Sequence, residues 1–260
     1  MIQAVLNDPH VPYHDPAAVN LTFEILKGVN PHRIDLLGDI LDNRLLSTKF
    51  KSTPKDRRFA RLQDELRPTR RLLERIRERH PRAVIVYHEG NHEARLTRWI
   101  ADNAPALEGV LDFPTLLGLP DLGISHRDYG HLERVGSLNL THGTVVRSKS
   151  GTSALAMLDR YGCNIMCGHT HRLSAVYETT GKDIYGAWEN GCLCRPSQHY
   201  TIGPNNWQQG FSIVTHVGDR FTVEQVPIVR GKAVYAGRLY AASEIKNPIC
   251  KGIAASREGS

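Results

Sequence analysis

The sequence lacks long apolar segments and an N-terminal targeting signal. No run approaches the roughly 18 apolar residues that a membrane-spanning helix needs. The apolar start, residues 1–6, has no basic residues before it and is too short for the apolar part of a signal peptide. These absences exclude a membrane-spanning protein and predict a cytoplasmic one whose first residues form a core strand.

Cysteine is also scarce, with five residues in the whole chain. An odd count spread over this length excludes the disulfide framework of a small secreted protein. Two closely spaced pairs, Cys163 with Cys167 and Cys192 with Cys194, could form a structural zinc site. The sequence favours a simpler interpretation, in which Cys163 and Cys167 are small apolar residues that flank or fill a buried strand.

The net charge of +6 is concentrated in one segment. Residues 51–82 contain twelve Lys and Arg against five Asp and Glu, so the rest of the chain is close to neutral. Such a segment indicates a surface for phosphate-bearing partners, nucleic acid among them. A solvated, arginine-rich helix face would explain it equally well.

The pattern of apolar residues predicts an α/β fold. The expected elements are strands over residues 2–6, 33–37, 83–87, 132–135, 137–141, 164–167, 174–180, 183–188, 211–216 and 221–227, and helices over 15–27, 94–104 and 153–161. Gly181-Lys182 and Gly218-Asp219 predict two hairpins. A mixed first half and a hairpin-rich second half predict a four-layer αββα sandwich of two mixed sheets flanked by helices.

The remaining segments are assigned by their composition. Residues 42–55 are expected to form a loop over the site, and residues 105–121 a loop with a helical turn. An amphipathic segment from residue 59 to 76 should be kinked or split by Pro68. We expect one domain over residues 1–240 and a tail, 241–260, that has little to bury and is partly disordered.

Five short polar blocks follow apolar segments along the chain. In order they are Asp8-Pro9-His10, Gly38-Asp39, Gly90-Asn91-His92-Glu93, His142-Gly143 and Gly168-His169-Thr170-His171. Ligands gather at the carboxyl ends of the strands in sheets of this kind, so the blocks are expected to meet there. They bring carboxylate, amide and imidazole donors, a set that suits Mn, Fe or Zn better than Mg or Ca. The sequence therefore predicts a site for two divalent metal ions, with Mn favoured.

In this order the blocks resemble the signature of the calcineurin-like metallophosphoesterase superfamily. The blocks cover residues 8–171, and the Asn190-Gly191 turn and residues 207–211 are similar to the closing strands of that family. The resemblance implies seven metal ligands. One metal would take Asp8, His10 and His171, the other Asn91, His142 and His169, and Asp39 would bridge them.

The resemblance also implies the reaction, which is in-line attack on phosphorus by a metal-bridging hydroxide. His92 would act as general acid, or stabilise charge on the leaving oxygen. Asp42 holds the position that orients this histidine in the protein-phosphatase branch. That branch continues with an arginine, whereas this chain has Asn43 there and Arg44 one place later. The departure weakens the protein-phosphatase interpretation.

Four further residues are weaker candidates. Arg95, one helical turn after Asn91, could bind two phosphate oxygens, or it could be a surface arginine. His14 and His199 could contact substrate from their loops, although a loop histidine is commonly only solvated. His88 could orient a metal ligand, and core filling is an equal alternative.

These residues predict a hydrolase of phosphate esters. Nucleic acid or nucleotide phosphodiesters are favoured as substrates because of the basic segment, residues 51–82. A phosphomonoesterase acting on phosphoprotein or small metabolites is the alternative. A noncatalytic, metal-binding interaction scaffold is a third possibility, but such a protein would commonly lack ligands, and this chain retains all seven together with His92.

Overall fold

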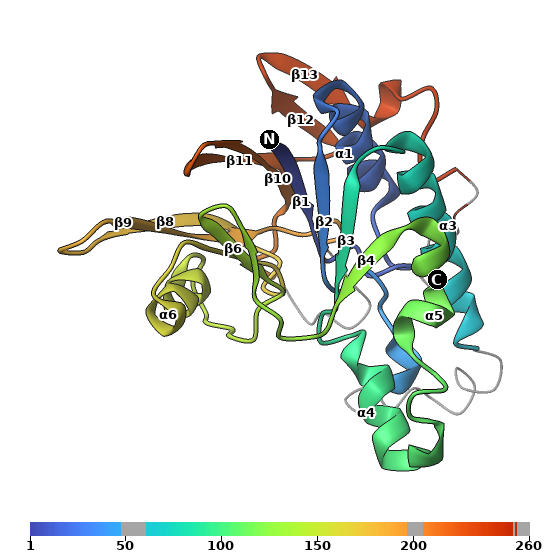
Figure 1. Cartoon of the computed structure of the whole chain (residues 1–260). Helices are drawn as coiled ribbons and strands as arrows, with labels where there is room; N and C mark the ends of the chain where they lie inside the picture. The colour runs from blue at the N-terminus through green and yellow to red at the C-terminus, as the bar shows by residue number, and fades with distance from the viewer. Residues whose placement is uncertain (48–60, 197–204, 252, 254–260) are drawn as a thin grey trace.

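Two β-sheets pack face to face in the computed structural model, which describes residues 1–47, 61–196, 205–251 and 253 (Figure 1). The larger sheet has the strand order β11-β10-β1-β2-β3-β4. Its strands are β1 (Ile2–Leu6), β2 (Arg33–Leu37), β3 (Val84–His88), β4 (Ile124–Arg127), β10 (Gln209–Val217) and β11 (Arg220–Ile228). Strands β1 to β4 are parallel, and the β10–β11 hairpin adds antiparallel to β1.

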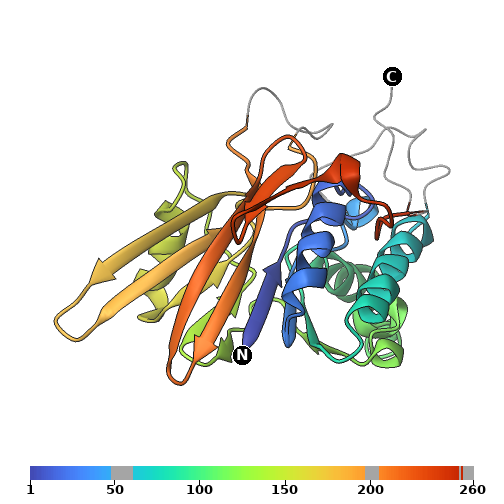
Figure 2. The ribbon, with the colours of Figure 1, turned by 90° about the horizontal axis from the view of Figure 1, so that it is seen from above.

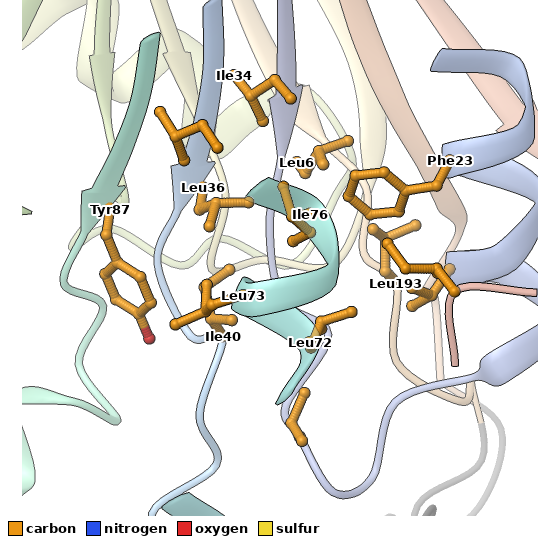
Figure 3. Close-up of a cluster of buried hydrophobic side chains, with 14 of the residues drawn as sticks. Leu6, Phe23, Ile34, Leu36, Ile40, Leu72, Leu73, Ile76, Tyr87 and Leu193 are labelled. Carbon is orange, nitrogen blue, oxygen red and sulfur yellow. The ribbon is translucent and has the colours of Figure 1, made fainter. Parts of the chain in front are cut away.

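Helices cover the outer face of this sheet. They are α1 (Pro16–Val29), α3 (Gln63–Arg79) and α5 (Phe113–Leu117). Helix α1 begins where the sequence predicts, because the Asp15 side chain accepts a hydrogen bond from the Ala17 amide and Pro16 occupies the first turn. Figure 3 shows the resulting core, in which Leu36 of β2 lies among side chains of α1 and α3 such as Phe23 and Ile76.

The smaller sheet has the order β5-β6-β7-β9-β8. Its strands are β5 (Glu133–Val135), β6 (Leu138–Thr141), β7 (Ile165–Cys167), β8 (Leu173–Thr179) and β9 (Ile184–Asn190). Helix α6 (Thr152–Tyr161) covers its outer face through Ala154, Met157 and Leu158. Between the sheets, Val5 and Leu37 of one pack with Met166 and Trp188 of the other. Figure 2 shows the two sheets side by side, each with its helices outside, which confirms the predicted αββα layers.

The structure differs from the sequence analysis in three segments. Strand β4 was not predicted, since its residues Ile-Ser-His-Arg carry little apolar pattern. A further hairpin, β12 (Lys232–Tyr235) with β13 (Arg238–Ala241), was not predicted. Pro68 does not split α3, which runs unbroken through it from Gln63 to Arg79.

The segment after residue 241 has more to bury than the sequence suggested. Ile249, Cys250 and Ile253 are buried in the core beside α1 and α3. Asn20 of α1 accepts a hydrogen bond from the Cys250 amide, and Arg75 of α3 donates one to the Ile249 carbonyl. These contacts fasten the described part of the tail to the helical face. In the described part of the chain, no helix is long and apolar enough to cross a membrane.

The five polar blocks follow strands whose carboxyl ends share one edge of the sandwich. Strands β1, β2 and β3 deliver the first three blocks, and β6 and β7 deliver the last two. Helix α4 (Ala94–Asn103) begins directly after the third block and lies beyond the ends of β2 and β3 (Figure 1). The fold therefore brings both sheets and the start of α4 to one place.

Candidate metal centre

The side chains of the five blocks converge into overlapping groups of possible metal ligands. Within each group the ligand atoms lie within 4.8 Å of one another. The groups are Asp8 with His10 and His171, His10 with Asp39 and His92, and Asp39 with His142 and His169. Six of the seven predicted ligands are thus brought together, with His92 beside them.

The first group surrounds Asp8. His171 Nε2 lies 3.2 Å and His10 Nε2 3.6 Å from Asp8 Oδ1, and the two Nε2 atoms lie 3.0 Å apart. The other carboxylate oxygen of Asp8 accepts hydrogen bonds from the side-chain amide of Asn7 and the backbone amide of His169. One oxygen is therefore held in place while the other faces the imidazoles.

The second group surrounds Asp39. His142 Nε2 lies 3.4 Å from Asp39 Oδ2 and 3.2 Å from Asn91 Oδ1. The same Asp39 oxygen lies 3.8 Å from His10 Nε2 of the first group. The ring of His169 lies 5.2 Å from that of His142, centroid to centroid. Asp39 thus stands between the two groups, in the place that a bridging ligand requires.

The burial and hydrogen bonds of the donor atoms fit divalent cations. Asp8 Oδ1 is buried and makes no hydrogen bond within the described part of the chain. A buried carboxylate oxygen without a partner is costly unless a cation or water completes it. Three of the imidazoles direct Nε2 inward and have the outer nitrogen occupied. His10 Nδ1 faces Asp42 Oδ1 at 3.0 Å, His142 Nδ1 faces the Leu37 carbonyl at 2.9 Å, and His171 Nδ1 faces Cys194 Sγ at 3.9 Å. Outer partners of this kind orient metal-binding imidazoles.

The backbone at the site is unusual in a way that points to function. Five of the seven predicted ligands have positive φ, which is the left-handed region. They are Asp8, His10, Asp39, His169 and His171, with φ values between 50° and 68°. Asp and His tolerate this region better than most residues, yet each instance costs energy and tends to persist where function requires it. The strands therefore end in turns that aim these side chains inward.

Glycine is needed at two positions because the blocks approach so closely. A Cβ on Gly90 would overlap the Asp39 carboxylate, and one on Gly38 would overlap the His142 ring. Gly38 also has a φ of 89°. The glycines of these two blocks thus allow strands β2 and β3 to bring their ligands into contact.

Glu93 holds two of the blocks together. Its carboxylate is fully buried and accepts hydrogen bonds from the amides of Asp39, Ile40, Leu41 and Gly90 and from the Tyr87 hydroxyl. Burial and the neighbouring Asp39 raise the pKa of Glu93, whereas these donors favour its charged form. The side chain makes no capping hydrogen bond to α4, although the helix begins directly after it. Its partners at residues 39–41 are remote in the chain, so no local pattern in the sequence indicates this role.

The predicted catalytic pair, His92 and Asp42, lies beside the first group. His92 Nδ1 is 3.1 Å from Asp42 Oδ1 and 2.7 Å from the Asp42 carbonyl oxygen. Arg95 donates hydrogen bonds to the same carbonyl at 2.9 Å and to His92 Nε2 at 2.9 Å. Because a guanidinium only donates, Nε2 accepts here and Nδ1 carries the proton. Arg95 therefore lies within reach of a phosphate at the site and also holds the imidazole in position.

The charges of the site are strongly coupled. Burial opposes ionisation of Asp8 and Asp39, yet the surrounding histidines hold the pKa of both carboxyls well below the usual range. Burial also opposes protonation of the imidazoles, but Asp39 raises the pKa of His142 to about 9, and Cys194 with Asp8 raises that of His171 to about 9. His169 differs, since burial and the neighbouring His142 lower its pKa to about 4. Without a cation, protons on the histidines balance the carboxylates.

The weaker candidates have different outcomes. His14 is fully buried instead of solvated, and its two ring nitrogens have no hydrogen-bond partner in the described part of the chain. The structure therefore gives it no surface toward a substrate. His88 faces Asp35 Oδ1 at 2.9 Å, away from the metal ligands, and belongs to a buried polar network with Arg33. His199 lies outside the described residues.

All five cysteines are free, and their grouping differs from the zinc site considered above. Cys192 and Cys194 lie beside His171, whereas Cys167 is buried in the core under α6. Cys167 thus fills a buried strand, as the simpler interpretation had it. Cys194 contributes to the site as the outer neighbour of a predicted metal ligand, a role that its sequence position did not indicate.

The basic segment is used largely within the fold. Residues 51–60 lie outside the described part of the chain. On α3, Arg75 and Arg79 donate hydrogen bonds to backbone carbonyls of residues 249 and 247, and Arg77 donates to several carbonyls, among them that of Leu122. These arginines fasten neighbouring segments, so the described part of this segment offers fewer free cations than its composition suggested.

Comparison with known proteins supports the fold more than a function. No family model matches the chain. Gene 54 protein of Mycobacterium phage L5 is 28% identical over 249 residues, which cover 91% of this chain and 97% of that protein. Gene 54 protein of Mycobacterium phage D29 is 26% identical with the same coverage.

Solved structures share the architecture at low sequence identity. Vacuolar Protein Sorting 29 from Cryptosporidium parvum has 15% identity and a TM-score of 0.50, and the match covers 92% of this chain and 97% of that one. Wild-type Vps29 from Entamoeba histolytica, complexed with Zn²⁺, has 15% identity and a TM-score of 0.47, with coverage of 90% and 96%. This chain thus shares its mixed α/β architecture with Vacuolar Protein Sorting 29.

Proposed function

We propose that this protein is a metal-dependent phosphoesterase of the calcineurin-like superfamily. The observation that carries the proposal is the convergence of the predicted donors around Asp8 and Asp39, with the Asp42–His92 pair at their side. Mixed carboxylate, amide and imidazole donors support two divalent cations, with Mn favoured over Fe and Zn.

The ligands would divide between two cations that share Asp39. Asp8, His10 and His171 would hold one, and Asn91, His142 and His169 the other. Bound there, the cations supply Lewis acidity toward phosphate oxygens and lower the pKa of water to near neutrality. The chain's own part is to hold these donors rigidly, through Glu93, the two glycines and the left-handed turns.

His92 is suited to donate a proton to the leaving oxygen. Its Nδ1 is fixed by Asp42, which leaves Nε2 to exchange a proton, and the neighbouring carboxylate stabilises the imidazolium. Arg95 occupies Nε2 in the structure. An anionic phosphate gives this guanidinium a better acceptor, so substrate binding would draw Arg95 away and leave Nε2 free for its proton.

Phosphodiesters of nucleic acid or nucleotides remain our favoured substrates, with phosphomonoesters of proteins or metabolites as the alternative. The basic segment gives less support for diesters than its composition suggested, because Arg75, Arg77 and Arg79 bind backbone carbonyls within the fold. Diesters are favoured instead by Arg95 and Arg98, which line a cavity beside the predicted ligands.

The test is hydrolysis by the metal-loaded protein. With Mn²⁺ bound, it should cleave p-nitrophenyl phosphate, bis-p-nitrophenyl phosphate or both. His92→Ala should lower turnover by about 10²-fold or more at unchanged metal content, and Asp39→Asn should lower metal content too. Asp219→Asn is a matched control because the Asp219 side chain is 86% exposed, at the turn between β10 and β11. Inactivity toward both esters, with two metal ions demonstrably bound, would favour the noncatalytic scaffold instead.

A further inference from the structure

A cavity of about 520 Å³ opens beside the candidate metal centre. Asn91 and His169 lie on its wall, so its inner end adjoins the predicted ligands of the second cation. A space of this size fits a ligand larger than a single phosphate group. The cavity therefore has room for whatever the phosphate is esterified to.

One face of α4 forms a wall of this cavity. Arg95, Arg98, Trp99 and Asp102 all line it, and their i, i+3, i+4, i+7 spacing places them on the same side of the helix. Another side of α4, which carries Ile100, is buried in the core. The helix thus presents an ordered series of side chains to the cavity, from Arg95 next to the metal centre to Asp102 about 10 Å further along the axis.

The aromatic content of the cavity is its most specific feature. Trp99 is 42% exposed although it is a large apolar residue, and Tyr129 lines the cavity from the β4–β5 loop. The Arg98 guanidinium lies over the Tyr129 ring, 5.8 Å from its centroid. Planar rings with an arginine form a typical stacking surface for nucleobases. Beyond Trp99, Asp102 and Asn103 offer a carboxylate and an amide that could bond to the edge of a base.

We infer that the α4 cavity binds the nucleoside part of a nucleotide ester whose phosphate lies at the metal centre. The inference rests on the proposed function and names its substrate class. Arg95 and Arg98 would face the phosphate and sugar, Trp99 and Tyr129 would stack on the base, and Asp102 with Asn103 would contact its polar edge. Residues of α4, and not the basic segment of residues 51–82, would therefore recognise the nucleoside.

Two chromogenic diesters with the same leaving group isolate the contribution of the nucleoside to substrate recognition. We compare kcat/KM for thymidine 5′-(p-nitrophenyl) phosphate with that for methyl p-nitrophenyl phosphate, using the full chain loaded with Mn²⁺. The thymidine ester should be preferred by about tenfold or more, the range expected for one stacked base. Trp99→Ala should remove most of this preference, and Trp99→Phe should retain most of it. Tyr177→Ala, which removes an aromatic residue 64% exposed on β8, serves as the control and should leave the ratio unchanged.

A binding measurement separates this inference from the proposed function. Thymidine 5′-monophosphate should quench tryptophan fluorescence in the metal-loaded wild type, and the quenching should disappear in Trp99→Phe. Inactivity toward both esters would count against the proposed function, while the titration would still decide on the cavity. Equal rates on the two esters, or a preference and quenching that survive loss of Trp99, would overturn the inference. A preference abolished by Arg98→Gln but kept by Trp99→Ala would also overturn it, because Arg98, and not a stacked base, would then carry the recognition.

Discussion

Asp42 Oδ1 lies 3.1 Å from His92 Nδ1, and the same oxygen lies 3.0 Å from Nδ1 of His10. One buried carboxylate thus orients both the proposed acid and a proposed metal ligand. Asp42→Asn should lower turnover by about 10- to 100-fold and weaken metal binding by a similar factor, the range found for outer partners of metal-bound histidines. Steady-state kinetics at saturating Mn²⁺ and a metal titration measure the two effects separately. Loss of turnover with unchanged metal affinity would show that Asp42 serves His92 alone.

Glu93 should matter for stability and for metal binding together. Glu93→Ala leaves the amides of residues 39–41 buried without an acceptor, and each lost bond of this kind costs about 1–3 kcal/mol. We expect the free energy of unfolding of the metal-free protein to fall by about 3 kcal/mol or more, and Mn²⁺ affinity to fall because Asp39 loses its anchor. Denaturant unfolding and a metal titration provide the measurements. Glu93→Gln, which keeps one acceptor oxygen, should be intermediate, and a Gln variant as weak as Ala would contradict this account.

Metal binding should release protons at neutral pH. The pKa values of His142 and His171 are about 9 without a cation, so both are protonated at pH 7. Each must lose a proton to bind a metal, whereas His169, with a pKa of about 4, is already neutral. Titration calorimetry in buffers of different ionisation enthalpy should detect about two protons released at pH 7 and fewer above pH 9. A result independent of buffer would contradict the prediction.

Glu65 should make stability depend on pH. Burial, and then the nearby Asp42, raise its pKa to about 7, although the Arg44 amide donates a hydrogen bond to it. Because the folded state holds this proton more tightly than the unfolded chain, the stability contribution is greatest below about pH 4.5 and falls as the pH rises to 7, by up to about 3 kcal/mol. Glu65→Gln should remove this pH-dependent part of the free energy of unfolding. Denaturant unfolding at pH 5 and pH 8 should show a smaller difference for the variant than for the wild type, and equal differences would contradict the assignment.

Much of the fold could be predicted because the apolar pattern and the turn residues agree. The β10–β11 hairpin, with Gly218-Asp219 at its turn, and α1, with its Asp15 cap and Pro16, both form where the sequence indicates. Strand β4 escaped detection because its four residues are stabilised by pairing with β3, an interaction remote in sequence. The tail was misjudged for a related reason: Ile249 is one isolated apolar residue in the sequence, and its burial depends on where α1 and α3 lie.

The predicted metal ligands could be named from the order of their blocks, since strand ends bring such residues together. The residues that hold these ligands in place could not be predicted. Glu93 acts on residues 39–41 through contacts that no local pattern encodes, and Cys194 meets His171 only because two loops converge. The helix over residues 94–104 could be predicted, but the position of its Arg98 and Trp99 beside the metal centre depends on the fold.

The left-handed turns at the strand ends also limit which residues can replace the predicted metal ligands. At positions 8, 10, 39, 169 and 171 the backbone itself disfavours β-branched and bulky side chains, whatever their affinity for a metal. The set of tolerated residues is therefore close to Asp, Asn, His and Gly. Attempts to change the metal preference by design should therefore exchange members of this set first. A thiolate or thioether ligand introduced at these positions would be opposed by the left-handed backbone, whatever its affinity for the metal.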